Sequence, residues 1–446
     1  MTTRQAPPET SRTVRADLLT GGAALGLVGA AVVVGAALYL AGRPVQASSA
    51  PFTAHWVPHV GPGTPLALAV AVLVILHGPR LAEALPWRRL LTAGYGAAVA
   101  WILSLALVDG WQRGLAGRLT TKDEYLSEVG GVTDLRAMVD GFADRILAYQ
   151  PDSWTTHVSG HPPGAFGVFL GLDRLGLGGG GWAALVCVAV GGLIAVAVPV
   201  TIRALGDEHA ARAAVPFLVL FPGAVWIGAS ADGLFAGVTA SGLGLLALAV
   251  TRRQIWPGVA AGILLAFGLY LSYGLTLIAV PALAVVLLAW RSAPPPWRPL
   301  GAAAAGGLAV VAAFTLAGFW WLDGYHLVVQ RYYQGVAADR PYAYWIWANL
   351  ALVVAGAGPV AAVILRRAWP ARRLGPAAVL PLAGLAAILI ADLSGLSKAE
   401  VERIWLPFTV WLLAGAALLP PGSRRGWLIA QAMTALLVNH LLLTSW

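Results

Sequence analysis

Long apolar runs, separated by short polar stretches, dominate the hydrophobic pattern of the chain. The first run covers residues 18–40, which is longer than the apolar core of a signal peptide, about 7–15 residues. A bilayer span needs about 20 apolar residues. We therefore expect an all-α, polytopic membrane protein with about thirteen transmembrane helices. A cleaved signal peptide is the weaker interpretation of the first run. The further runs lie at 64–78, 90–109, 181–203, 211–231, 233–251, 256–272, 274–290, 299–322, 344–365, 374–393, 405–420 and 426–445.

One apolar segment, PGAFGVFLGLDRLGL at 163–177, is too short for a span and contains Asp173 and Arg174. A run of this length favours an interfacial or re-entrant helix. It ends the only long loop between apolar runs. The expected organisation is a cytoplasmic tail (1–17), three transmembrane helices (18–108), a large folded outer loop with juxtamembrane helices (109–180) and a bundle of about ten helices (181–446).

Composition excludes the other broad classes. Of 446 residues, 59% are hydrophobic and 11% are charged, whereas soluble domains carry about 25% charged residues. Intrinsic disorder needs the opposite balance. The single cysteine, Cys187, excludes a disulfide framework and disfavours a cysteine metal site. Many Ala and Gly, with only Lys122 and Lys398 as lysines, suggest a bacterium with a GC-rich genome.

The charged residues separate by side once the chain is threaded through a membrane. Arginine pairs such as 88–89, 252–253 and 366–367 fall in one set of short loops, which the positive-inside rule places in the cytoplasm. The net charge of +9 is thus a topology signal, and nucleic acid is not an expected partner. Most carboxylates fall on the opposite, outer side. Seven of the 20 lie between Asp123 and Asp152.

Two motifs mark the outer loop 109–180. Asp123-Glu124-Tyr125 lies in its first part, and His161-Pro162-Pro163-Gly164 lies where the chain returns to the membrane. Paired prolines impose a stiff, extended entry that fixes the direction of the preceding histidine. Loops of this length are uncommon unless they are functional. We expect this loop to be folded and to carry the chemistry.

Together, a DE pair and an HPP motif that leads into a short apolar helix ending in LDRLGLG resemble the C-type glycosyltransferase superfamily. The similar branch contains the protein O-mannosyltransferases and the bacterial aminoarabinose transferases. The resemblance implies a polytopic enzyme that uses a polyprenyl-phosphate-linked sugar on the outer face. It implies that Asp123 is the catalytic base, with Glu124 beside it, and it carries the HPP role to His161 and Pro162.

The segment PFLVLFPGAVWIGASADGLFAG also resembles the next helical hairpin of that superfamily, which ends in an acidic residue, here Asp232. This chain departs from the family pattern in the position of the acidic motif. The acidic motif follows the third apolar run instead of the first, which an extra N-terminal hairpin explains.

The expected chemistry defines the other candidate residues. An acceptor hydroxyl needs a carboxylate base, and an oxocarbenium-like transition state is stabilised by nearby negative charge. The leaving lipid phosphate needs basic partners, of which arginine offers bidentate geometry. Arg403 is the first choice, with Glu402 as its neighbour. The other basic candidates at the outer side are Lys122, Arg331, Arg340 and Lys398.

Other interpretations stay open. A transporter or flippase has many spans and buried ionisable groups, and a non-catalytic membrane scaffold is also consistent with the pattern. Asp123 as a solvated acid and His161 as a loop hydrogen-bonder are the ordinary structural alternatives. No phosphate-binding glycine loop follows a strand, so a nucleotide sugar is not favoured. A divalent cation is possible, but no ligand spacing demands one, and no metal ligand is assigned. The acceptor could be an envelope polysaccharide, a glycolipid or a protein.

Overall fold

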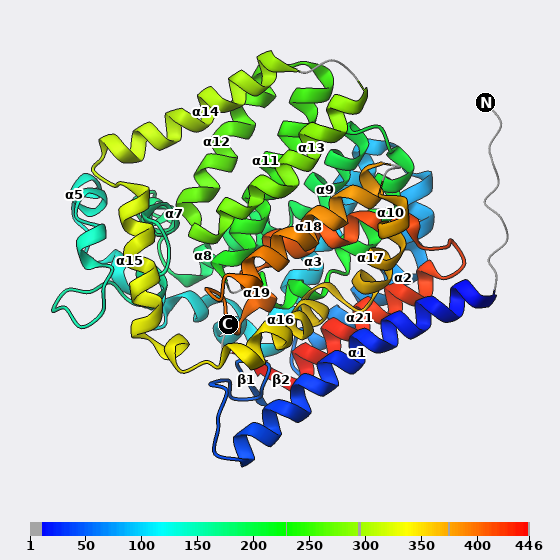
Figure 1. The fold of residues 1–446 in the computed structure, drawn as a ribbon, viewed down its shortest axis with the longest axis horizontal. Helices are drawn as coiled ribbons and strands as arrows, with labels where there is room; N and C mark the ends of the chain where they lie inside the picture. The colour runs from blue at the N-terminus through cyan, green and yellow to red at the C-terminus, as the bar shows by residue number, and fades with distance from the viewer. Residues whose placement is uncertain (1–10, 229, 293–295, 373–374, 445–446) are drawn as a thin grey trace.

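The computed structural model describes residues 11–228, 230–292, 296–372 and 375–444 (Figure 1). Helices form almost all of its regular structure. Within the described residues the only strands are β1 (Ala54–Trp56) and β2 (Leu442–Thr444), which pair antiparallel with Ala54 opposite Thr444. The expectation of an all-α, polytopic membrane protein is confirmed.

Eight helical segments in the described part of the chain are long and apolar enough to cross a membrane. A strongly bent pair raises the number to nine at most. The predicted total of about thirteen is therefore not confirmed, because other apolar helices are shorter than a full span. The eight are α1 (Ser11–Leu40), α2 (Thr64–Ala84), α3 (Trp87–Ala106, extended to Asp109), α8–α9 (Gly180–Gly191 and Ile194–Ala204), α11 (Ala231–Arg252), α13 (Ala279–Ser292, preceded by a 3₁₀ turn from Tyr273), α14 (Trp297–Leu316) and α18 (Pro376–Leu393).

The expected continuous run 344–365 is broken. Its two parts, α16 (Tyr342–Ala357) and α17 (Val360–Ala371), meet at 102°. Gly358 lies between them with φ +82°, a conformation that favours glycine, and Pro359 follows it. At Gly358 the backbone leaves helical geometry, with ψ 158°, and α16 ends there. Hydropathy alone does not detect this break because the residues on both sides are apolar.

The run 211–231 is also interrupted. Helix α10 ends at Val219, a 3₁₀ turn covers Pro222–Trp226, and α11 begins only at Ala231. The remaining helices of the bundle follow the same pattern of short or interrupted elements. They are α10 (Glu208–Val219), α12 (Ile255–Leu271), α15 (Trp321–Gln334), α19 (Val401–Ile404), α20 (Leu406–Leu412, continued as a 3₁₀ turn to Leu418) and α21 (Arg424–Leu441).

The segment between α3 and α8 is folded from short helices. Asp134 caps α5 by accepting hydrogen bonds from the backbone N–H groups of Arg136 and Ala137. Trp154 is buried and donates from Nε1 to the Phe142 carbonyl at 3.0 Å. These contacts give the segment a small core of its own. Its helices are α4 (Leu126–Val129), α5 (Leu135–Asp140), α6 (Thr156–Ser159) and α7 (Pro163–Arg174).

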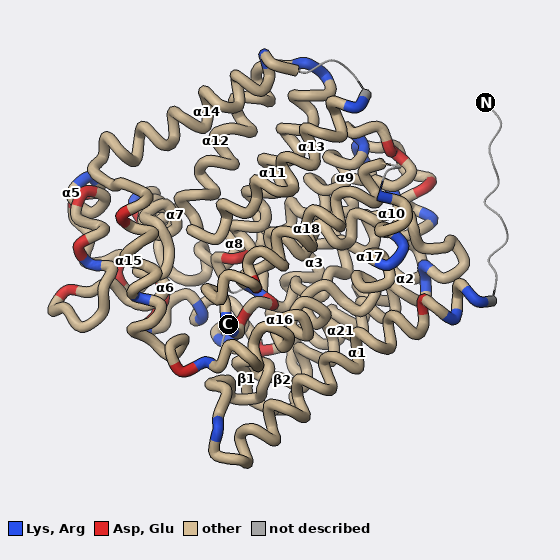
Figure 2. Tube along the Cα trace, in the orientation of Figure 1, with Lys and Arg blue, Asp and Glu red and all other residues tan. Residues whose placement is uncertain are grey.

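The two ends of the bundle differ in charge. The segment with α5, α6 and α7 lies with α15 at one end (Figure 1). Basic residues gather at the opposite end, around α9, α10 and α17 (Figure 2). The most deeply buried span is α11, and its first turn points towards the short helices. The bundle core thus holds Asp232, at the start of α11, next to the segment between α3 and α8.

Candidate functional site

A small polar cavity lies where the segment between α3 and α8 meets the bundle. Its volume is about 10 Å³, close to the smallest space that holds one water molecule. Residues far apart in sequence meet here because α11, α19 and the segment between α3 and α8 converge. The lining residues are Glu124, Tyr125, His157, His161, Ser230, Ala231, Asp232, Phe235 and Arg403.

Asp232 and Arg403 form a buried ion pair at the centre of this cluster. Arg403 Nη1 donates to Asp232 Oδ2 at 2.6 Å, and both side chains are less than a tenth exposed. Ser230 caps α11 by accepting from the Asp232 N–H, and its hydroxyl donates to Asp232 Oδ2 at 2.7 Å. A carboxylate in the first turn also interacts favourably with the helix dipole. Asp232 is thereby held in one orientation.

Glu400 links Arg403 to a second arginine. Its carboxylate accepts from Arg403 Nη2 at 2.9 Å and from Arg340 Nη2 at 2.8 Å. Glu400 and Ala399 both have positive φ, +62° and +69°, a strained conformation that is concentrated at functional sites. Burial raises the pKa of Glu400, but the two arginines outweigh it and the net pKa is lowered. Sequence analysis missed Glu400, because an acid between two apolar runs carries no motif.

His157 is a neutral hydrogen-bonding link. Its Nε2 lies 3.4 Å from Arg403 Nη2 and its Nδ1 lies 2.9 Å from the Asp123 carbonyl. Arginine can only donate and a carbonyl can only accept, so this network assigns the hydrogen to Nδ1. Burial and the charge of Arg403 lower the pKa of His157 to about 4. The imidazole therefore stays uncharged at neutral pH. No sequence motif had marked His157 as a site residue.

His161 of the HPP motif faces the same cavity. Its Nδ1 lies 2.8 Å from the His157 carbonyl and 2.9 Å from Tyr125 Oη. The carbonyl can only accept, so Nδ1 carries the hydrogen. Burial lowers the pKa of this histidine. Pro162 stands at the N-cap of α7 with Pro163 as the first helical residue, so the paired prolines fix the point at which His161 enters the site.

The DE pair divides between two environments. Glu124 is buried and lines the cavity, and its Oε1 lies 3.3 Å from His157 Nδ1. Burial raises its pKa to about 7, with Asp232 and Asp123 adding to this effect and Arg403 opposing it. The Asp123 side chain is exposed and lies 3.4 Å from Thr156 Oγ1. Its backbone carbonyl, not its carboxylate, binds His157.

The other residues expected from the sequence lie outside the cavity lining. Lys122 is exposed. Arg331 donates to Ser159 Oγ at 3.2 Å, and Lys398 donates from Nζ to the Arg340 carbonyl at 3.0 Å. Burial raises the pKa of Glu402 to about 8, and its Oε2 has no hydrogen-bond partner among the described residues. Of the predicted basic residues, Arg403 alone reaches the cavity.

The described residues contain no cluster of side chains suited to bind a metal ion. Among the residues of 11–228, 230–292, 296–372 and 375–444, no group of three or more His, Cys, Asp or Glu side chains is arranged to hold an ion. The acids of the cluster are engaged by Arg403, Arg340 and His157 instead. The arrangement supports proton transfer and anion binding by protein side chains.

Comparison with known proteins gives matches at the level of structure. No protein-family model and no curated protein matches the sequence. A solved structure of ArnT from Cupriavidus metallidurans in the apo state is 20% identical, with a TM-score of 0.47, and the match covers 74% of this chain and 61% of that one. The Archaeoglobus fulgidus oligosaccharyltransferase, in complex with zinc and sulfate, is 18% identical, with a TM-score of 0.43, and covers 79% and 53%.

This chain thus spans about half to three fifths of the length of the solved proteins it matches. Identity below 25% and TM-scores below 0.5 assign no activity to it.

Proposed function

We propose that this protein is a membrane glycosyltransferase that moves a sugar from a polyprenyl-phosphate-linked donor to a hydroxyl group of an envelope acceptor. The acceptor is a polysaccharide, a glycolipid or a protein, and the reaction takes place on the extracytoplasmic side of a bacterial membrane. One observation carries the proposal. Glu124 of the DE pair, His161 of the HPP motif, Asp232 and Arg403 converge on one cavity where the short helices meet the bundle.

The reaction needs a base, and the DE pair supplies it. The acceptor oxygen forms a bond to the anomeric carbon as the bond from that carbon to the phosphate oxygen breaks, and the acceptor proton passes to a carboxylate. The resemblance assigns this proton to Asp123. The burial of Glu124 beside Asp232 favours Glu124 for the same step, because a carboxyl with a pKa of about 7 is well matched to proton transfer at neutral pH.

Arg403 is the proposed partner of the leaving phosphate. Its guanidinium is buried, and although burial lowers its pKa, Asp232 and Glu400 raise it overall, so the charge is permanent. A phosphate would compete with these two carboxylates for the Nη atoms. Arg340 can then keep Glu400 compensated, while Asp232 is left to stabilise positive charge that develops on the sugar. A cavity of about 10 Å³ admits a sugar only when the short helices around it move.

Substitution of the two acids separates their roles. Membranes that contain wild-type protein, Asp123→Asn or Glu124→Gln are supplied with a panel of polyprenyl-phosphate sugars, and transfer of radiolabel to extracted acceptors is measured. Loss of the base should lower the rate about 100-fold or more. Glu128→Gln is the matched control, because Glu128 lies in the same segment, accepts from the Thr155 N–H at 3.0 Å and does not line the cavity.

Full transfer in both Asp123→Asn and Glu124→Gln would overturn the proposed mechanism. A transporter gives a different result in the same preparation. Sealed vesicles would then accumulate the substrate without forming a covalent product, and neither substitution would change the amount of glycosylated acceptor.

A further inference from the structure

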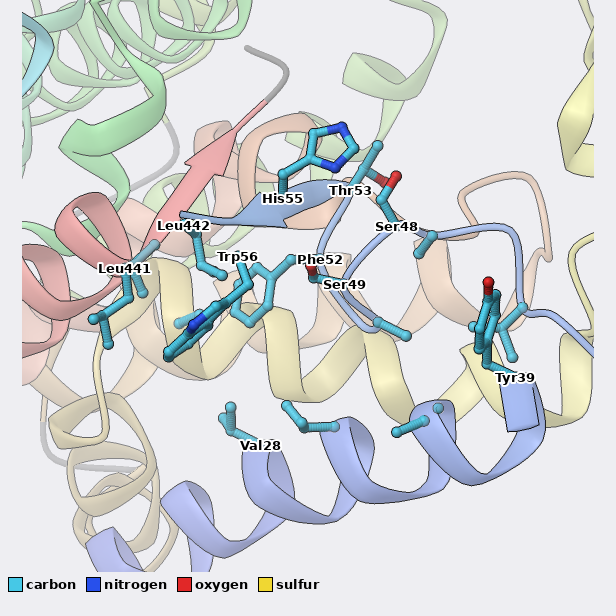
Figure 3. Close-up of a pocket in the computed structure, with 18 of the residues that line it drawn as sticks. Val28, Tyr39, Ser48, Ser49, Phe52, Thr53, His55, Trp56, Leu441 and Leu442 are labelled. Carbon is cyan, nitrogen blue, oxygen red and sulfur yellow. The ribbon is translucent and has the colours of Figure 1, made fainter. Parts of the chain in front are cut away.

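A second, much larger cavity lies away from the polar cluster, between α1 and α21 and beneath the 44–56 segment (Figure 3). Its volume is about 1070 Å³, at the upper end for small-molecule sites. In α1 the lining residues recur at helical spacing, as at Leu25, Val28, Val32 and Tyr39. In α21 the lining residues Thr434, Leu437, Val438 and Leu441 do the same. Two helical faces, both mainly apolar, therefore form opposite walls.

The 44–56 segment, which covers this cavity, is hydrogen-bonded to the bundle. Trp345 Nε1 donates to the Val45 carbonyl at 3.1 Å, and Arg340 Nε donates to the Gln46 carbonyl at 3.4 Å. Pairing of β1 with β2 holds the end of the 44–56 segment against the end of α21. Tyr344 Oη donates to the Ala31 carbonyl at 2.9 Å, which links α16 to α1. The space is thus a built cavity with fixed walls.

The polar part of the lining carries almost no charge. Gln46, Ser48, Ser49 and Thr53 contribute amide and hydroxyl groups, and no Lys, Arg, Asp or Glu lines the cavity in the described part of the chain. Thr53 Oγ1 is buried and has no hydrogen-bond partner among the described residues. His55 is also among the lining residues, and its ring points from β1 to the side away from α1 (Figure 3). An uncharged polar group of a ligand would find partners here, whereas a phosphate would find no arginine or lysine.

The position of the cavity identifies the apolar part of its occupant. Helix α1 is a candidate membrane span with a mean hydropathy of 2.2, and most of its residues are exposed. The cavity therefore opens beside a helix that faces lipid. Water is disfavoured in an apolar cavity, since each molecule needs two to four polar partners. A hydrocarbon chain from the surrounding membrane meets only apolar groups along Val28, Val32 and Leu437.

We propose that this cavity binds the hydrocarbon tail of a membrane lipid whose uncharged, hydroxyl-bearing head group lies against Gln46, Ser48, Ser49 and Thr53. The inference does not depend on the proposed transfer reaction. It concerns a separate site, made largely by α1 and the segment that follows it. A hydroxyl of the head group would give Thr53 Oγ1 the partner that it lacks within the protein.

Photo-crosslinking tests both parts of this proposal. Protein in nanodiscs is exposed to a diacylglycerol with a diazirine in one acyl tail, or to a phosphatidylglycerol with the same tail, and crosslinked peptides are identified by mass spectrometry. The diacylglycerol should label peptides of α1 and α21 at least about 10-fold more than the phosphatidylglycerol. Val32→Trp, which fills the cavity, should remove this labelling. Val33→Trp is the matched control, because Val33 is 67% exposed and does not line the cavity.

Two further variants keep the test decisive. Leu437→Trp fills the cavity from the opposite wall and should have the same effect as Val32→Trp, which excludes misfolding of α1 as the cause. Thr53→Val retains the shape of the side chain and removes the hydroxyl, so it should reduce diacylglycerol labelling but not phosphatidylglycerol labelling. Equal labelling by the two probes, or undiminished labelling in both tryptophan variants, would overturn the proposal.

Discussion

Two buried clusters of arginine and carboxylate lie at opposite ends of the bundle. They contain the same residue types but differ in their surroundings. Near the N-terminus Asp17 of α1 is paired with Arg366 and Arg367 of α17, and its side chain is 4% exposed. At the other end Asp232 of α11 is paired with Arg403, and its side chain is 6% exposed. Burial and pairing alone do not distinguish the two.

The difference lies in what surrounds each pair. Two guanidinium groups bind the Asp17 carboxylate, and Arg367 Nε lies 3.0 Å from each of its oxygens. These ion pairs hold α1 against α17. Around Asp232, by contrast, two histidines and Glu124 have pKa values displaced by burial, and they line a cavity. An ion pair whose charges are fully compensated serves to hold two helices together. An ion pair with titratable neighbours is suited to chemistry.

Glu124→Gln should give the largest difference between the two clusters, measured as the rate of sugar transfer. We expect sugar transfer to fall by about 10²- to 10⁴-fold without loss of folded protein. The base must be deprotonated, so wild-type activity should rise with pH through about 7, and the variant should lack this rise. Transfer rates between pH 5 and pH 9 measure both effects. A wild-type profile that is flat across neutral pH would exclude Glu124 as the base.

Arg403→Met should cause the largest loss of stability. Removal of one partner from a buried pair leaves an uncompensated charge and costs about 3–5 kcal/mol. Here both Asp232 and Glu400 lose a partner. Thermal unfolding in detergent measures the change, and Arg331→Met, which removes an arginine bound to Ser159, is the comparison. A variant as stable as wild type would mean that these acids are protonated or solvated.

Asp17→Asn should lower stability by a smaller amount, about 1–3 kcal/mol, because Arg366 is partly exposed and can bind water. Its transfer activity per folded molecule should match wild type. Unfolding midpoints and transfer rates on the same preparations make this measurement. A loss of transfer as large as that of Glu124→Gln would erase the distinction between the two clusters.

Glu402→Gln should have an effect on stability that depends on pH. Burial raises the pKa of Glu402 from 4.5 to about 8, so the protonated form stabilises the fold below pH 4.5 and this contribution is lost as pH rises towards 8. A glutamine does not ionise. The variant should therefore gain thermal stability relative to wild type between pH 5 and pH 9. A difference that does not change with pH would show that Glu402 is ionised throughout.

The sequence identified several residues that line the cavity but not how their side chains are directed. The DE and HPP motifs, Asp232 and Arg403 were all identified from the chain, and Glu124, His161, Asp232 and Arg403 line one cavity. The other four basic candidates do not line the cavity, because an outer position in sequence does not fix the direction of a side chain. They are Lys122, Arg331, Arg340 and Lys398. His157 and Glu400 were missed since their roles depend on Arg403, which is more than 240 residues from His157.

The length and order of the apolar runs determined that this chain builds an all-α membrane bundle, because burial of backbone polar groups in lipid requires helices. Asp134 and Ser230, which are residue types that favour N-caps, cap α5 and α11. Only the tertiary structure decided that Glu124 turns inward while Asp123 turns outward, and that the run 344–365 breaks by 102°. Those outcomes depend on contacts between distant segments, whose energies no local pattern encodes.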